Sequence, residues 1–290
     1  MIAELIIGGL ASGSLYALIA IAVVLVLQAT DVPNFAQGEM AMFSTFVAYT
    51  MLTGYGAGWW VALPVAVVFA ILLGIVVQQL VIRPLMGAPI MSAVIATLGL
   101  NMALHSVAAM IWGNLTNVFA SPVADWPVFK LFGVNVSPDS ALTIVVSVAM
   151  IAIFTLILRH TRAGIALRAA SQDAQVARLM GIPVNRAFAL AWAMGSVAGL
   201  VAGLLVAPIL FLDVNMMAPL LIKGFAGAVL GGLSSLSGVF VGGLLLGVAE
   251  NLMGVYISPG MGDALSFILI IVVLIVAPAG LFGRVKSTKV

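Results

Sequence analysis

Polar and ionisable side chains occur inside otherwise apolar sequence at two places. Residues 34–39 read Asn-Phe-Ala-Gln-Gly-Glu where a second apolar run begins, and Lys223 and Glu250 lie within later apolar runs. An ionised carboxylate at the centre of a bilayer costs about 3 kcal/mol even on a lenient insertion scale. Glu39 is therefore expected to face the protein interior or an interface, because lipid would not solvate its charge.

The segment 34–39 admits two interpretations. Pro33 has no backbone donor and Asn34 is a good capping residue, so the segment can be a helix N-terminus with Glu39 in the first turn. The same cap is compatible with a lining for a solute. In that case the candidate residues of the translocation path are Asn34, Phe35, Gln37 and Glu39.

Lys223 and Glu250 are expected to form a mutual pair, since pairing is the least costly way to keep both charged at membrane depth. Both remain candidates for the translocation path, although a structural pair or snorkelling to an interface explains them as well. The run between them is rich in glycine and alanine, which predicts close helix packing. Residues 231–238 also indicate a turn between two short helices, as in a re-entrant or broken element.

Enzyme motifs are missing from the sequence. There is no cysteine, which excludes disulfides and thiolate metal sites, and His105 and His160 are too few for a metal site built from histidine. Neither a Gly-x-x-x-x-Gly-Lys-Ser/Thr phosphate loop nor a Gly-x-Ser-x-Gly elbow occurs. We therefore expect no catalytic residue, no metal site and no cofactor in this chain, and we regard both histidines as packing or interface residues.

Composition requires that membrane helices carry these residues. Of 290 residues, 64% are hydrophobic and only 7% are charged, against roughly a quarter charged in a soluble domain. A bilayer needs about 20 apolar residues per crossing, so the chain has room for about eight to ten. The net charge of +2 gives no reason to expect nucleic-acid binding.

The predicted fold is an all-α polytopic membrane protein with about eight to nine membrane helices, and residues 1–290 form a single transmembrane domain. The second and seventh apolar runs are short or rich in glycine, so they are candidates for re-entrant or broken elements. The nine predicted helices are 5–29, 35–53, 59–82, 90–112, 139–159, 186–212, 218–232, 236–256 and 262–282.

Positive charge indicates which loops face the cytoplasm. Of eleven Lys and Arg residues, five lie between Arg159 and Arg186, three between Arg284 and Lys289, and one is Arg83. The positive-inside rule places these stretches and the C-terminus in the cytoplasm, and the loop near 113–138 on the other side.

The loop 160–185 contains a further predicted helix outside the bilayer. Its sequence from 164 to 180 has strong helix formers, and Gly181 and Pro183 end it. Residues that recur near one face are Ile165, Ala169, Val176 and Met180. About 17 residues can form one or two short helices. Such a segment must dock on a partner, and anionic lipid headgroups are an alternative.

Together these segments resemble the H-type membrane permease subunit of bacterial ABC importers for branched-chain amino acids. The family commonly has His at the position of Gln37, and a Gly and Ile lead-in where this chain has Asp31-Val32-Pro33. The resemblance covers almost the whole chain in family order. It rests on residues 13–20, 34–39, 83–85, 168–182, 228–233 and 242–247.

The resemblance implies a permease of the bacterial inner membrane that works with partners. These are a second, identical or related permease, two cytoplasmic ATPases that hold ATP and Mg²⁺, and an external solute-binding protein. The substrate would be a small amino acid of branched-chain type, another apolar amino acid, an amide or urea. The ATPase-coupling residues implied are Arg168, Ala170, Ser171, Asp173, Ala174, Arg178 and Gly181.

The residues alone leave a second function open. Glu39, Lys223 and Glu250 at membrane depth are also what a self-sufficient secondary transporter or channel would use.

Overall fold

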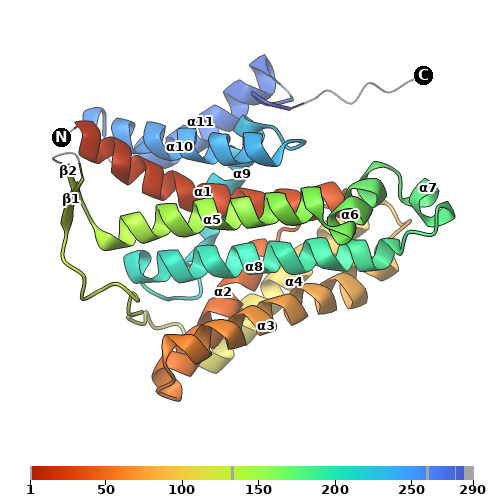
Figure 1. Ribbon diagram of the computed structural model, residues 1–290, viewed down its shortest axis with the longest axis horizontal. Helices are drawn as coiled ribbons and strands as arrows, with labels where there is room; N and C mark the ends of the chain where they lie inside the picture. Colours follow the sequence, from red (N-terminus) through yellow and green to blue (C-terminus); the bar gives the residue numbers. More distant parts are fainter. Residues whose placement is uncertain (1, 132–133, 259–260, 278, 284–290) are drawn as a thin grey trace. The chain divides into compact units, whose positions relative to one another are not determined.

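The computed structural model describes residues 2–131, 134–258, 261–277 and 279–283. The chain divides into two compact units: unit 1 comprises residues 1–24, 123–148 and 219–290, and unit 2 comprises 25–122 and 149–218. Three helices, α1 (Ile2–Thr30), α5 (Pro138–His160) and α9 (Met217–Gly231), contribute residues to both units. Figure 1 shows the helices in chain order by colour.

Within the described residues, six helices are long and apolar enough to cross a membrane. At 1.5 Å per residue, the 29 residues of α1 extend about 43 Å, more than the roughly 30 Å of a hydrocarbon core. The chain is therefore an all-α polytopic membrane protein. The six are α1, α5, the helix Trp59–Leu85 that begins with α3 (Trp59–Val77), α4 (Ile90–Trp112), α8 (Val184–Leu210) and α10 (Leu236–Tyr256).

Each of the nine predicted ranges contains a helix in the described part of the chain, but eight to nine membrane crossings are not confirmed. The second and seventh predicted helices, which the sequence marked as short or rich in glycine, are short in the structure. The helix α2 (Gln37–Tyr49) has 13 residues and is followed by a π-helical turn, and α9 (Met217–Gly231) has 15. The helix α11 (Met261–Val276) has 16.

Two predicted helix ends are too late in the sequence. The range 262–282 ends at Val276 in α11, because Pro278 follows and the residue before a proline disfavours helical dihedral angles. The range 186–212 ends at Leu210, where Phe211 adopts a φ of 64°. The basic stretch 284–289 lies outside the described residues.

A hairpin that the sequence analysis did not predict lies in the loop before α5. Strand β1 (Phe129–Leu131) pairs antiparallel with β2 (Val134–Val136), with Lys130 opposite Asn135. Three-residue strands have too short an alternating pattern to be recognised beside long apolar helices.

Unit 2 is built around α8, on which α2 and α3 pack. The buried core contains Val26, Met40, Val77, Ile82 and Trp192. Close approach of α3 to α8 depends on Gly74, because a Cβ there would lie 2.6 Å from the carbonyl oxygen of Trp192. The helix α2 also packs directly on α8, which places the polar side chains at its start against α8.

Unit 1 is held by close approach of glycines on α1, α9 and α10. A Cβ added at Gly9 would lie 2.7 Å from the Cα of Val248, and one at Gly243 would lie 2.6 Å from the backbone nitrogen of Ala17. Gly227 of α9 meets Gly243 in the same way. The predicted packing role of the glycine-rich run is confirmed, because small residues let helix backbones approach where no hydrophobic drive exists in lipid.

The glycine contacts predict that Gly13→Ala destabilises the protein. The added methyl group would lie 2.7 Å from the Cα of Leu244, which is backbone and cannot rotate away. Overpacking of this kind costs about 1–3 kcal/mol. Thermal unfolding of the detergent-purified protein, followed by tryptophan fluorescence, should show a lower midpoint. Gly99→Ala is the control, since a Cβ there meets nothing within 4 Å, and equal midpoints for the two variants would contradict the assignment.

Candidate functional site

Polar side chains at the start of α2 form a buried network. Asn34 and Gln37 are fully buried, and the Asn34 side-chain amide donates to Oε1 of Gln37 over 3.0 Å. Nε2 of Gln37 donates to the carbonyl oxygen of Gly195 in α8 over 2.9 Å. The network therefore joins the first turn of α2 to the middle of α8.

The helix start differs in detail from the prediction. Asn34 does not cap the first turn: Ala36 is the N-cap residue, and Asn34 Oδ1 instead accepts from the Ala36 backbone N–H in an Asx turn before the helix. Glu39 lies in the first turn of α2, as predicted. A carboxylate is favourable at this end of a helix because the backbone N–H groups there carry partial positive charge.

The helix α4 supplies further polar partners that the sequence analysis missed. Nδ2 of Asn101 donates to the Phe35 carbonyl oxygen over 3.2 Å, and Nδ1 of His105 lies 3.5 Å from Oε2 of Glu39. Thr97 contacts the Pro33 carbonyl oxygen at 3.5 Å. These three residues recur every four positions, so they share one face of a helix, and this spacing was the available signal.

Among these residues, the Glu39 and His105 pair reaches the surface of the described protein. Glu39 is 7% exposed, whereas the side chain of His105 is 35% exposed. Oε2 of Glu39 accepts no hydrogen bond from the described residues, so the contact with His105 is electrostatic and depends on whether the imidazole is protonated. The side chains of Asn34 and Gln37 are fully buried, and their hydrogen bonds hold residues 34–37 against α8.

The predicted pair of Lys223 and Glu250 is confirmed. Nζ of Lys223 lies 2.5 Å from Oε1 of Glu250, and the two side chains are only 15% and 17% exposed. Nζ also donates to the Tyr16 hydroxyl over 3.5 Å and lies 5.4 Å from the centre of its ring. Contact with the ring face adds cation–π attraction, so Tyr16 helps to hold the ammonium group.

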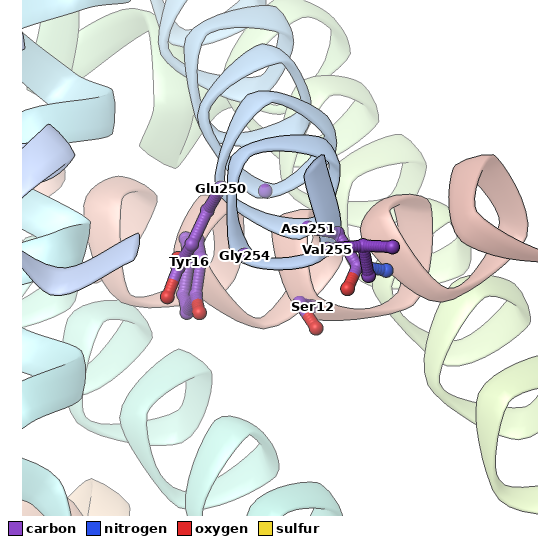
Figure 2. Close-up of a pocket in the computed structure, with 7 residues that line it drawn as sticks. Ser12, Tyr16, Glu250, Asn251, Gly254 and Val255 are labelled. Atoms are coloured by element: carbon purple, nitrogen blue, oxygen red, sulfur yellow. The ribbon is translucent and has the colours of Figure 1, made fainter. Parts of the chain in front are cut away.

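A cavity of about 290 Å³, lined by Glu250 but not by Lys223, lies between α1 and α10 (Figure 2). Oε2 of Glu250 is buried and accepts no hydrogen bond from the described residues. Nδ2 of Asn251 donates to the Leu5 carbonyl oxygen over 2.9 Å. The cavity was not foreseen from the sequence. Its lining residues are Ser12, Tyr16, Gly247, Glu250, Asn251, Gly254 and Val255.

The loop 160–185 folds into two short helices, α6 (Arg162–Gln172) and α7 (Ala174–Leu179), as the sequence predicts. The helix α6 lies beside the N-terminal part of α8, and α7 lies beyond that end of α8 (Figure 1). Oδ1 of Asp173 accepts from the backbone N–H groups of Gln175 and Val176, so this residue caps α7. Gly181 has a φ of 80°, a conformation that ends a helix and that glycine adopts without strain.

The seven coupling candidates lie in different environments. Ala170 is only 2% exposed and belongs to the face of the loop that is held within unit 2, where α6 packs on α8. Ser171 and Ala174 are half-buried, and Arg168, Asp173, Arg178 and Gly181 are exposed. The same loop also exposes large apolar side chains, namely Ile165, Val176, Leu179 and Met180.

Comparison with known proteins gives one consistent result. The family model described as "Branched-chain amino acid transport system / permease component" matches residues 5–274. The chain is 31% identical to the high-affinity branched-chain amino acid transport system permease protein LivH of Escherichia coli strain K12, over 97% of this chain and 96% of that protein. It is 32% identical to the probable LivH of Methanocaldococcus jannaschii, over 95% and 91%. It is 29% identical to BraD of Pseudomonas aeruginosa, over 98% and 97%.

The Lys223 and Glu250 pair predicts opposite outcomes for single and double substitution. Glu250→Leu removes the carboxylate that neutralises a mostly buried ammonium group and should destabilise the protein by about 3–5 kcal/mol. Lys223→Met together with Glu250→Leu removes both charges at similar volume and should restore nearly the original stability. Thermal unfolding of the three proteins in one detergent measures this, and a double variant less stable than the single one would show that the two residues act independently.

Proposed function

Because the chain belongs to the family of branched-chain amino acid transport permeases, it is a permease subunit of an ABC importer, and we propose that it carries a small apolar amino acid. It is a multi-pass protein of the inner membrane. A transport permease moves its substrate without changing it chemically, so the family is not one of enzymes. The match to the family model is the observation that supports the permease function, and the names of the relatives support an apolar amino acid as the substrate.

The proposed assembly supplies what this chain lacks. A second permease, identical or related, completes the translocation path, and an external binding protein delivers the substrate. Two cytoplasmic ATPase subunits bind ATP and Mg²⁺ and provide the energy. On this proposal the chain itself holds no cofactor, and its C-terminus lies in the cytoplasm with the loop 160–185.

The loop 160–185 is the proposed site for the ATPase. Val176 is 54% exposed and Leu179 is 86% exposed, and Arg168 and Arg178 lie near them in the sequence. Exposed apolar side chains on a short helix outside the bilayer favour a protein partner with a matching groove. The buried residues Leu167 and Ala170 hold α6 within unit 2, so the docked surface is attached to a packed element.

Movement of the loop would reach the polar network of α2 through α8. The helix α6 packs on α8, and Gly195 of α8 accepts the hydrogen bond from Gln37 at the start of α2. ATP binding would draw the ATPase subunits together and displace the docked loop, and α8 would carry that displacement to residues 34–39. Access would thereby alternate between the two sides of the membrane, with each nucleotide state favouring one of them.

Leu179→Arg should prevent co-purification of the permease with its ATPase. The guanidinium would have to be buried in an apolar contact without a partner, and the loss of binding should exceed about tenfold. Leu115→Arg is the matched control, since Leu115 is 81% exposed and lies in the loop predicted on the opposite side. Ala170→Arg is unsuitable because Ala170 is buried and its replacement would disturb folding.

Retention of the ATPase by the Leu179→Arg variant would refute the docking site. Gradient-driven uptake by the purified chain alone in liposomes would instead support a self-sufficient transporter.

Gln37→Leu should weaken coupling without preventing assembly. The substitution removes the hydrogen bond from Gln37 to the Gly195 carbonyl oxygen and leaves the buried amide of Asn34 without its acceptor, at a cost of about 1–3 kcal/mol, and it weakens the link between α2 and α8. We expect ATP hydrolysis by the complete importer to continue while uptake per ATP falls several-fold. Gln37→His, which keeps a ring N–H donor, should retain most of the uptake. Equal uptake by the Leu and His variants would argue against this route of coupling.

A further inference from the structure

We propose that a transmembrane helix of the second permease subunit packs on one exposed face of α4, beside the pair of Glu39 and His105. This inference rests on the proposed function, which requires a second permease, and assigns the surface that meets it. We call this surface the α4 face. Its exposed residues, spaced three or four apart along the helix, are Ile95, Gly99, Met102, Ala103, Ser106 and Met110.

The helix α4 is poorly covered by its own chain, yet it is not the most apolar helix. Among the six described helices that could cross a membrane, its apolar stretch has the smallest buried share, 11%, against 28% in Trp59–Leu85 and 22% in α5. Its mean hydropathy is nevertheless clearly lower than that of either helix. A helix surrounded by lipid should be the most apolar of the set, so the composition of α4 indicates another cover.

Two polar groups on α4 are left without partners by the described residues. Nδ1 of His105 faces Glu39, which leaves Nε2 of the same imidazole without a hydrogen bond. The hydroxyl of Ser106 makes no hydrogen bond to a carbonyl of its own helix, whereas Ser44 and Thr45 of α2 each donate to the carbonyl four residues earlier. Hydrocarbon can bond to neither group, so protein or water must supply the partners.

The position of these groups along α4 keeps them away from the lipid headgroups. At 1.5 Å per residue, His105 is about 22 Å from the start of α4 at Ile90 and about 10 Å from its end at Trp112. Ser106 is the next residue. Long side chains such as lysine can extend to an interface from such a depth, but an imidazole and a hydroxymethyl group are too short.

Small residues on the α4 face allow another helix to approach closely. A Cβ added at Gly99 would meet nothing within 4 Å, so this glycine is not required for packing within the chain. Gly99 and Ala103 have the Gly-x-x-x-small spacing that brings two membrane helices into backbone contact. Ser106 lies two turns beyond Gly99 on the same face, where its hydroxyl can bond to the partner helix.

The apolar side chains of the α4 face favour protein over water as the cover. Met102 is 71% exposed and Met110 is 84% exposed, and water would gain little from either. Methionine is flexible and polarisable, so it adapts to the irregular surface of a partner. The second permease subunit would therefore present apolar side chains to the methionines and a hydroxyl or amide group near His105 and Ser106.

Gly99→Leu tests the close approach. The new side chain meets no atom of its own chain, so thermal unfolding of the isolated permease should show no lower midpoint. In the complete importer the leucine would overpack the contact, and recovery of the second permease subunit in a pull-down should fall about tenfold or more. Gly254→Leu on α10 is the matched control, because a Cβ there also meets nothing within 4 Å, and it should retain the second subunit.

Photocross-linking in membranes that contain the complete importer tests the same contact without disturbing the small residues. We expect p-benzoylphenylalanine in place of Met102 to attach to the second permease subunit, identified by mass spectrometry. The control carries the probe in place of Leu72, which is 54% exposed on the wholly apolar helix α3 and should face lipid.

The proposal is overturned if Gly99→Leu retains the second subunit as well as Gly254→Leu does. It is also overturned if the probe at Met102 attaches only to lipid or to its own chain, or forms no adduct, as in a water-filled path. Neither measurement needs ATP or substrate. Co-purification of the ATPase and ATP-driven uptake test the proposed function separately, so an importer that passes those tests and fails these loses only the assignment of α4.

Discussion

Polar groups in this protein must find their partners inside the protein, because hydrocarbon offers none. Unit 2 meets this constraint by directing the side chains of Asn34 and Gln37 to each other and to a carbonyl oxygen of α8. Unit 1 meets it by pairing Lys223 with Glu250. The close glycine contacts between helices in unit 1 serve the same end, since they bring the backbones near enough for such pairs to form.

The two polar clusters are satisfied to different degrees. In the network of α2, Asn34 and Gln37 are bonded and fully buried, which suits a rigid element that transmits displacement. In the cluster of α1, α9 and α10, Oε2 of Glu250 is buried and accepts no hydrogen bond from the described residues.

The sequence predicted well which segments form helices, because the composition and length of an apolar run determine whether it forms a membrane helix. The length of each apolar run placed the nine helices along the sequence. The pairing of Lys223 with Glu250 followed from the cost of an unpaired charge in lipid. The sequence could not predict contacts that depend on which helices are neighbours. These are the contact of His105 with Glu39, the hydrogen bond of Asn101 to the Phe35 carbonyl oxygen, and the cavity beside Glu250. The spacing of residues in a sequence shows which side chains share one face of a helix, but it does not show which other helix packs on that face.

The helices α1 and α5 each belong to both units. Hydrogen bonding in a helix is cooperative along its length, so fraying of one portion of α1 weakens the turns that follow in the other unit. Neither unit can then melt as an independent foldon without disrupting a helix that the other requires. Calorimetry of the isolated chain should accordingly record a single endotherm, and amide exchange in the central turns of α1 and α5 should follow global rather than local opening.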